Sequence, residues 1–172
     1  MLYSVIENFG PGEKGWEEFI KGHYIKNLTS FDSVDHVLCP SKFTPESLED
    51  WENCIDEDFM IEYISNLDYA TKVQKSYPNS KLVGLECEIN CDAVKTLIGY
   101  DILDGYNDVS LITNWGPHDE DHPLKTLVIQ NNGLLSSYEI AKKALELLTR
   151  SSKDDDHVKG CKIWAVHNPT HK

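Results

Sequence analysis

Apolar residues recur with two different periods along the chain, and the two periods predict a mixture of strands and helices. Short apolar runs predict strands over residues 2–9, 34–38, 81–89, 108–115, 124–129 and 161–167, and alternation at every second position is clear over residues 81–89. Spacings of three and four predict helices over residues 13–24, 44–55, 66–77 and 136–150. Residues 59–64 fit either a strand or a helix, and we take them as helical. The mixture predicts an α+β fold with a central, largely antiparallel sheet and helices packed on it.

Three of the predicted helices begin with recognisable capping residues. Thr44 precedes Pro45, a pair that suits the N-cap and first helical positions. Asn66, or Ser65 before it, can cap the helix that follows. Ser136 and the glutamate three residues later fit the pattern of a capping box.

The length of 172 residues predicts a single domain, residues 1–172, with a disordered tail over residues 168–172. The apolar fraction of 40% is that of a globular chain. No apolar run approaches the roughly 20 residues that a membrane-spanning helix needs. The first residues lack the basic region and long apolar run of a signal peptide. We therefore expect a cytoplasmic protein that does not bind membranes.

The net charge of −13 is concentrated in two segments. Residues 43–71 contain nine carboxylates and no lysine or arginine, and residues 96–124 contain six carboxylates and again no base. Carboxylates without counter-charges repel one another and destabilise a compact state, so such a field more often serves contact or solubility than folding. Nucleic acids and anionic membranes are poor partners for these segments, whereas a basic protein is a good one.

Motifs of catalysis are scarce in this chain. It has no nucleophile elbow, no glycine-rich phosphate loop and no zinc-protease motif. One dense group of titratable residues, His118 to His122 with three carboxylates between them, could ligate a divalent cation. The simpler interpretation is an exposed polar loop between Pro117 and Pro123. We expect no enzyme activity, no cofactor and no metal, and keep a small metal-dependent enzyme centred on this group as an alternative.

Five cysteines, at positions 39, 54, 87, 91 and 161, are an odd number for a disulfide framework. In a cytoplasmic protein they are expected to be buried thiols. Cys87 and Cys91 have the wrong spacing for a common zinc knuckle, and no second cysteine pair follows them. We therefore interpret the cysteines as core residues.

Aromatic residues are interleaved with the carboxylates of the second acidic segment. Tyr106 and Trp115 have the character of interface anchors, with the nearby acids supplying steering and pairing. The alternative, with about equal weight, is that these rings cover the edge of the sheet.

Residues 99–116, GYDILDGYNDVSLITNWG, resemble segments of small bacterial proteins encoded beside toxin genes. The chain as a whole is similar in size, acidity and lack of catalytic motifs to immunity proteins of polymorphic-toxin and contact-dependent growth inhibition systems. That resemblance implies a protein that binds the C-terminal domain of a cognate toxin, often a basic nuclease, and blocks it. It assigns no catalytic residues.

The charge pattern and the resemblance lead to the same hypothesis, a stoichiometric inhibitor of a bacterial toxin. The expected contact acids are Asp56, Glu57, Asp58, Asp104, Asp108, Asp119, Glu120 and Asp121, and the expected anchors are Tyr106 and Trp115. Besides the metal-dependent enzyme, a protein that mimics nucleic acid through its acidic surface remains an alternative.

Overall fold

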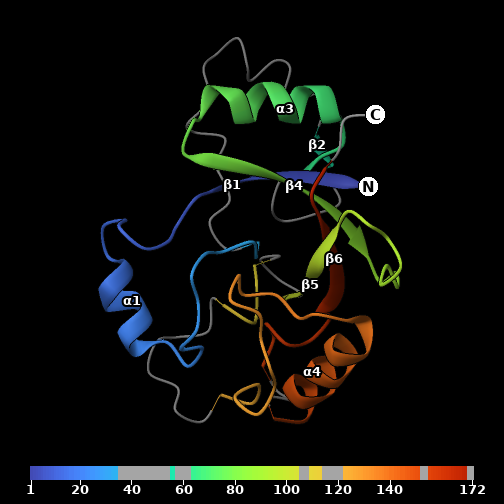
Figure 1. The fold of residues 1–172 in the computed structure, drawn as a ribbon. Coiled ribbons are helices and arrows are strands. Elements are labelled where there is room, and N and C mark those ends of the chain that lie inside the picture. The colour runs from blue at the N-terminus through green and yellow to red at the C-terminus, as the bar shows by residue number, and fades with distance from the viewer. Residues whose placement is uncertain (35–54, 57–62, 105–108, 114–121, 152–154, 170–172) are drawn as a thin grey trace.

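The computed structural model describes residues 1–34, 55–56, 63–104, 109–113, 122–151 and 155–169. They form one six-stranded sheet with the strand order β2-β3-β1-β4-β6-β5, in which every neighbouring pair is antiparallel (Figure 1). The strands are β1 (Leu2–Glu7), β2 (Ile55–Asp56), β3 (Tyr63–Ile64), β4 (Ser80–Cys87), β5 (Leu97–Leu103) and β6 (Lys162–His167). The helices are α1 (Trp16–Gly22), α3 (Leu67–Ser76) and α4 (Tyr138–Ser151). The predicted α+β fold with an antiparallel sheet is confirmed.

No helix among the described residues is both long and apolar enough to cross a membrane.

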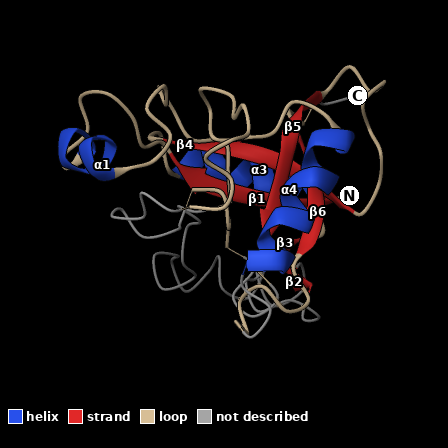
Figure 2. Cartoon of the chain, turned by 90° about the horizontal axis from the view of Figure 1, so that it is seen from below, coloured by secondary structure: helices blue, strands red, loops and turns tan. Residues whose placement is uncertain are grey.

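The two faces of the sheet carry different cores because side chains alternate along each strand. One face holds a cluster that includes Ile6, Leu85 and Trp164. On the opposite face, α3 packs on β1 and β4, while α4 packs on β5 and β6. Figure 2 shows α4 beside these last two strands and α1 lying apart from the sheet.

Both long helices form where the sequence predicts them, but only one has the predicted cap. At the start of α3, Asn66 Oδ1 accepts a hydrogen bond of 3.0 Å from the backbone N–H of Tyr69. At the start of α4 the capping residue is Ser137, whose Oγ accepts from the N–H of Ile140. The predicted capping box with Ser136 is wrong by one residue. The helix begins at Tyr138, so a glutamate at position 139 falls one residue short of the position that closes the box.

Two predicted strands are wrong, and the strands β2, β3 and β5 were not predicted as strands. Residues 111–113 and 123–126 form turns, and Ser110 makes one isolated bridge to Leu103. Their apolar side chains, such as Ile112 and Leu124, are fully buried in the main core without joining the sheet. The residues of β5 were not predicted as a strand, because a glycine at position 99 and an aspartate at position 101 interrupt their apolar pattern.

The other predicted elements are partly described. β3 shows that residues 63–64 are extended and not helical, because they pair with β1 and β2. α1 is shorter than the helix predicted over residues 13–24. Of the helix predicted over residues 44–55, only Ile55 is described, and it belongs to β2 and not to a helix. Of the strand predicted over residues 34–38, only the first residue is described. Within the predicted tail, the backbone N–H of Asn168 donates to Thr96 O at 2.8 Å.

Two glycines in the sheet provide a matched test of packing. A Cβ at Gly99 would lie 2.8 Å from Gln130 Nε2, Leu134 Cβ and Leu135 O, whereas a Cβ at Gly84 would mainly meet the flexible Met1 side chain. We expect Gly99→Ala to lower the free energy of unfolding by about 2–3 kcal/mol, and Gly84→Ala by less than about 1 kcal/mol. Urea denaturation of both variants measures this difference. Equal losses would contradict the close packing of β5.

Candidate functional site

Most of the ten predicted partner-binding residues lie outside the described part of the chain. These are Glu57, Asp58, Tyr106, Asp108, Trp115, Asp119, Glu120 and Asp121. Of the remaining two, Asp56 belongs to β2 and Asp104 directly follows β5. Among the described strands, β2 and β5 form the opposite ends of the sheet order, which places them roughly 20–25 Å apart at the usual strand spacing. The two acidic segments therefore contribute to different ends of the sheet.

Asp104 does not have the exposed position predicted for a contact acid. The residue is only 3% exposed, and its Oδ2 lies 3.2 Å from Nδ1 of His157. Its backbone N–H donates to Val109 O at 2.9 Å. The carboxylate thus connects the end of β5 to the turn that contains His157 and is covered by the chain itself.

Asp101 is the second acid of this segment that is buried, with 0% exposure. Its Oδ1 accepts from Ser110 Oγ at 2.6 Å and from the backbone N–H of Ile102 at 2.8 Å, and its Oδ2 accepts from the N–H of Val34 at 2.9 Å. Burial raises the pKa of Asp101 to about 6, although these three hydrogen bonds oppose the rise. Its carboxylate connects β5 to two loops and has a structural role.

Of the group from His118 to His122, only His122 lies in the described part of the chain. Its ring is 1% exposed and stacks on Tyr24, with ring centroids 3.9 Å apart and an angle of 7° between the planes. Its Nδ1 accepts from the N–H of Leu124. The exposed loop expected at this position is therefore wrong for His122, which packs inside the protein.

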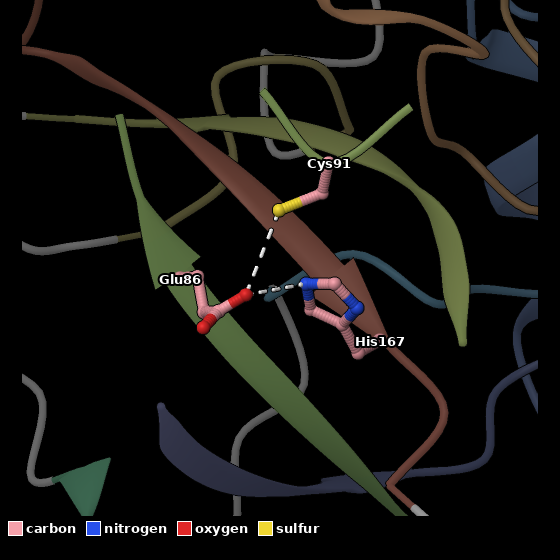
Figure 3. Close-up of side chains that lie close together, drawn as sticks. All are labelled: Glu86, Cys91 and His167. Atoms are coloured by element: carbon pink, nitrogen blue, oxygen red, sulfur yellow. Dashed lines mark hydrogen bonds and ion pairs between the residues drawn. The ribbon is translucent and has the colours of Figure 1, made fainter. Parts of the chain in front are cut away.

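A different group of side chains meets at the junction of β4 and β6. Glu86 comes from β4, His167 is the last residue of β6, and Cys91 lies in the loop between β4 and β5 (Figure 3). Glu86 Oε2 lies 3.5 Å from Cys91 Sγ and 3.2 Å from His167 Nε2. Because Gly84 pairs with His167, the side chain of Glu86 two residues further along β4 projects from the same face of the sheet.

The loop that carries Cys91 is fixed by backbone hydrogen bonds. The N–H of Cys91 donates to Tyr100 Oη at 2.7 Å, and the carbonyl of Cys91 accepts from the N–H of Val94 at 2.8 Å. Asp92 Oδ1 accepts from the N–H of Tyr138, which ties the loop to the start of α4. Cys91 is 3% exposed, so its thiol is held inside the protein and faces Glu86.

The thiol and the imidazole of this group are both neutral near pH 7. Burial lowers the pKa of His167, and the nearby Glu86 only partly opposes that effect. Burial raises the pKa of the Cys91 thiol, and Glu86 raises it further. A neutral thiol is a weak nucleophile, so the arrangement does not resemble an activated cysteine–histidine pair. One thiol, one imidazole and one carboxylate are, in contrast, common ligands of zinc-like divalent metals.

The sequence contains no local signal for this group. The cysteines were interpreted as core residues, and burial of Cys91 agrees with that interpretation. The two neighbours of Cys91 in space are Glu86 of β4 and His167 of β6, and no local spacing in the sequence links all three residues. Only the pairing of β4 with β6 brings them together.

Comparison with protein-family models, curated proteins and solved structures finds no match to this chain. The resemblance of residues 99–116 to immunity proteins therefore stays a prediction. Within this segment, the described residues include most of β5 and the bridge at Ser110. Function has to be inferred from the chain's own residues and their arrangement.

Burial of Asp101 makes the stability of the protein depend on pH. Its folded-state pKa of about 6 lies above the ordinary 3.8, so the folded protein holds this proton more tightly than the unfolded chain does. Its contribution to stability is therefore fully present below pH 3.8 and is lost as the pH rises through 6. The free energy of unfolding of the wild type minus that of Asp101→Asn should fall by about 2–3 kcal/mol between pH 4 and pH 7.

Denaturant unfolding at a series of pH values measures this difference, with Asp32→Asn as a control at a partly exposed carboxylate. A difference that stays constant with pH would show that Asp101 titrates normally.

Proposed function

We propose that this protein is an immunity protein, a stoichiometric inhibitor that binds and neutralises a cognate bacterial toxin domain, most simply a basic nuclease. The observation that carries the proposal is the first acidic segment, residues 43–71, with nine carboxylates and no lysine or arginine. A charge field of one sign accelerates association with an oppositely charged partner and excludes partners of like charge. An inhibitor that must act before its toxin does damage gains from such fast association.

The position of this segment in the fold supports a role in contact. Its described residues form β2, β3 and the start of α3, and β2 is the end strand of the described sheet. Asp56 lies on β2, and Asp68 is exposed in the first turn of α3. An end strand offers backbone groups that a partner can pair with, and carboxylates beside it favour a basic partner.

The second acidic segment contributes less exposed charge than its composition suggests. Asp101 and Asp104, two of its six carboxylates, are buried and hydrogen-bonded within the chain. We therefore assign the main contact to Asp56, Glu57 and Asp58. Further contact residues proposed in the second segment are Asp108, Asp119, Glu120 and Asp121, with Tyr106 and Trp115 as anchors.

The proposal is tested by co-expression with the product of the neighbouring gene. A stable one-to-one complex with a basic protein, together with loss of that protein's toxicity, is the expected result. A partner that binds nucleic acid without being toxic, and from which this chain displaces DNA, would instead support nucleic-acid mimicry. Failure of the two proteins to associate would count against an inhibitor of that neighbour.

Neutralising the acids around β2 should slow association with the toxin. We expect the triple substitution Asp56→Asn, Glu57→Gln and Asp58→Asn to reduce the association rate constant about tenfold at low salt, with a smaller effect on dissociation. Surface plasmon resonance at two ionic strengths measures both rates, and the difference should shrink as salt screens the charges.

The matched control removes the same number of charges at the exposed glutamates of α1 and the turn before it. Glu13→Gln, Glu17→Gln and Glu18→Gln change the net charge equally but lie far along the chain from β2. An equal loss of rate in both triple variants would show that net charge alone matters and that the β2 acids are not the contact.

A further inference from the structure

Three separate segments of the fold bring one carboxylate, one thiol and one imidazole to a single point. They are Glu86 of β4, Cys91 of the loop between β4 and β5, and His167 at the end of β6, whose candidate ligand atoms all lie within 4.8 Å of one another. We propose that these three side chains bind a zinc ion. The site goes beyond the proposed inhibitor function and is independent of it.

The spacing of the ligand atoms fits tetrahedral zinc. Bond lengths of about 2.3 Å to sulfur and about 2.0 Å to nitrogen and oxygen place tetrahedral ligands about 3.5 Å apart for a sulfur–oxygen pair and about 3.3 Å apart for a nitrogen–oxygen pair. The corresponding distances are 3.5 Å from Cys91 Sγ to Glu86 Oε2 and 3.2 Å from His167 Nε2 to Glu86 Oε2. Two of the three distances between ligand atoms therefore match a bound ion, and the third, between Cys91 and His167, is within 4.8 Å.

His167 provides an independent indication of a ligand. The residue is 0% exposed, and its Nε2 lies 3.2 Å from Glu86 Oε2, at ion-pair distance but without good hydrogen-bond geometry. Buried polar atoms without a hydrogen bond are rare because each costs about 1–3 kcal/mol. Figure 3 shows this nitrogen facing Glu86, on the side where the Cys91 thiol also points. Coordination to a metal would satisfy the nitrogen.

The surroundings orient the ligands as a metal site requires. The other ring nitrogen of His167, Nδ1, lies 3.3 Å from Thr96 Oγ1, which can accept a hydrogen bond from Nδ1–H and so leave the lone pair of Nε2 for the metal. The carbonyl of Thr96 accepts from the N–H of Asn168, so the threonine is fixed beside the histidine. The thiol of Cys91 is fixed through the bond from its backbone N–H to Tyr100.

The site is reachable, and its occupation would join three segments. The side chain of Glu86 is 27% exposed, which gives an ion a route from solvent. Three protein ligands leave the fourth tetrahedral position for water or for a group from another molecule. A bound zinc ion would link β4, β6 and the loop between β4 and β5. Its binding should stabilise the folded state, and the tighter the folded protein binds zinc, the larger the stabilisation.

The test uses the full chain, treated with a chelator and then titrated with zinc chloride by calorimetry and with cobalt chloride by absorption. We expect one ion per chain, a thiolate-to-cobalt charge-transfer band and a higher melting temperature with zinc. Cys91→Ser and His167→Asn should weaken zinc binding at least 100-fold and abolish the band. The matched controls Cys161→Ser and His157→Asn remove a half-buried thiol and an exposed imidazole outside the group. They should leave the zinc affinity and the charge-transfer band unchanged.

Three further variants, at Glu86 and Thr96, keep the test decisive if a buried substitution prevents folding. Glu86→Gln, at the most exposed of the three ligands, should weaken zinc binding at least tenfold. Thr96→Ala should weaken it about tenfold, and Thr96→Ser should restore it, because only the hydroxyl positions His167. Absence of zinc binding by the folded chain, or binding that Cys91→Ser and Glu86→Gln leave unchanged, would overturn the proposal.

Discussion

The antiparallel pairing of β4 with β6 is the constraint on which the rest of the structure depends. On one side of this seam, β1, β3 and β4 pack with α3, and on the other side β5 and β6 pack with α4. The ladder from Gly84–His167 to Cys87–Trp164 joins these two halves. β6 is the last strand in the sequence, yet it lies between β4 and β5. The sheet is complete only when the C-terminal strand is in place, which makes many of its contacts non-local.

Contacts between loops and the sheet explain why several polar groups can be buried. A buried carboxylate or imidazole is costly unless it finds partners, and here the partners come from segments that the sheet brings together. Asp101 accepts hydrogen bonds from Val34 and Ser110, which lie in two different loops, and from the N–H of the next residue of β5. His23 accepts from the N–H of Ile25 and lies 3.1 Å from Thr113 O, and burial lowers its pKa. These contacts fix loops onto the sheet without regular secondary structure.

The acidic composition therefore divides into two physical roles. Asp101 and Asp104 act inside the protein, where they hold loops and a turn against β5. The first acidic segment, which ends in α3, supplies exposed charge such as Asp68, and the proposed inhibitor function rests on it. The group of Glu86, Cys91 and His167 belongs to neither role. It lies on the seam itself, where a bound ion would reinforce the pairing that joins the two halves.

The sequence by itself determined the elements whose apolar period is strong and whose ends are marked. β1, β4, β6, α3 and α4 all form close to the predicted residues, because local burial patterns and caps specify them. The tertiary structure decided the rest. Apolar residues such as Ile112 and Leu124 enter the core from turns, and no local pattern distinguishes that burial from a strand. Whether a carboxylate such as Asp104 is exposed depends on a partner, His157, that only the fold supplies. His167 meets Glu86 and Cys91 for the same reason, since strand pairing joins residues that the sequence keeps far apart.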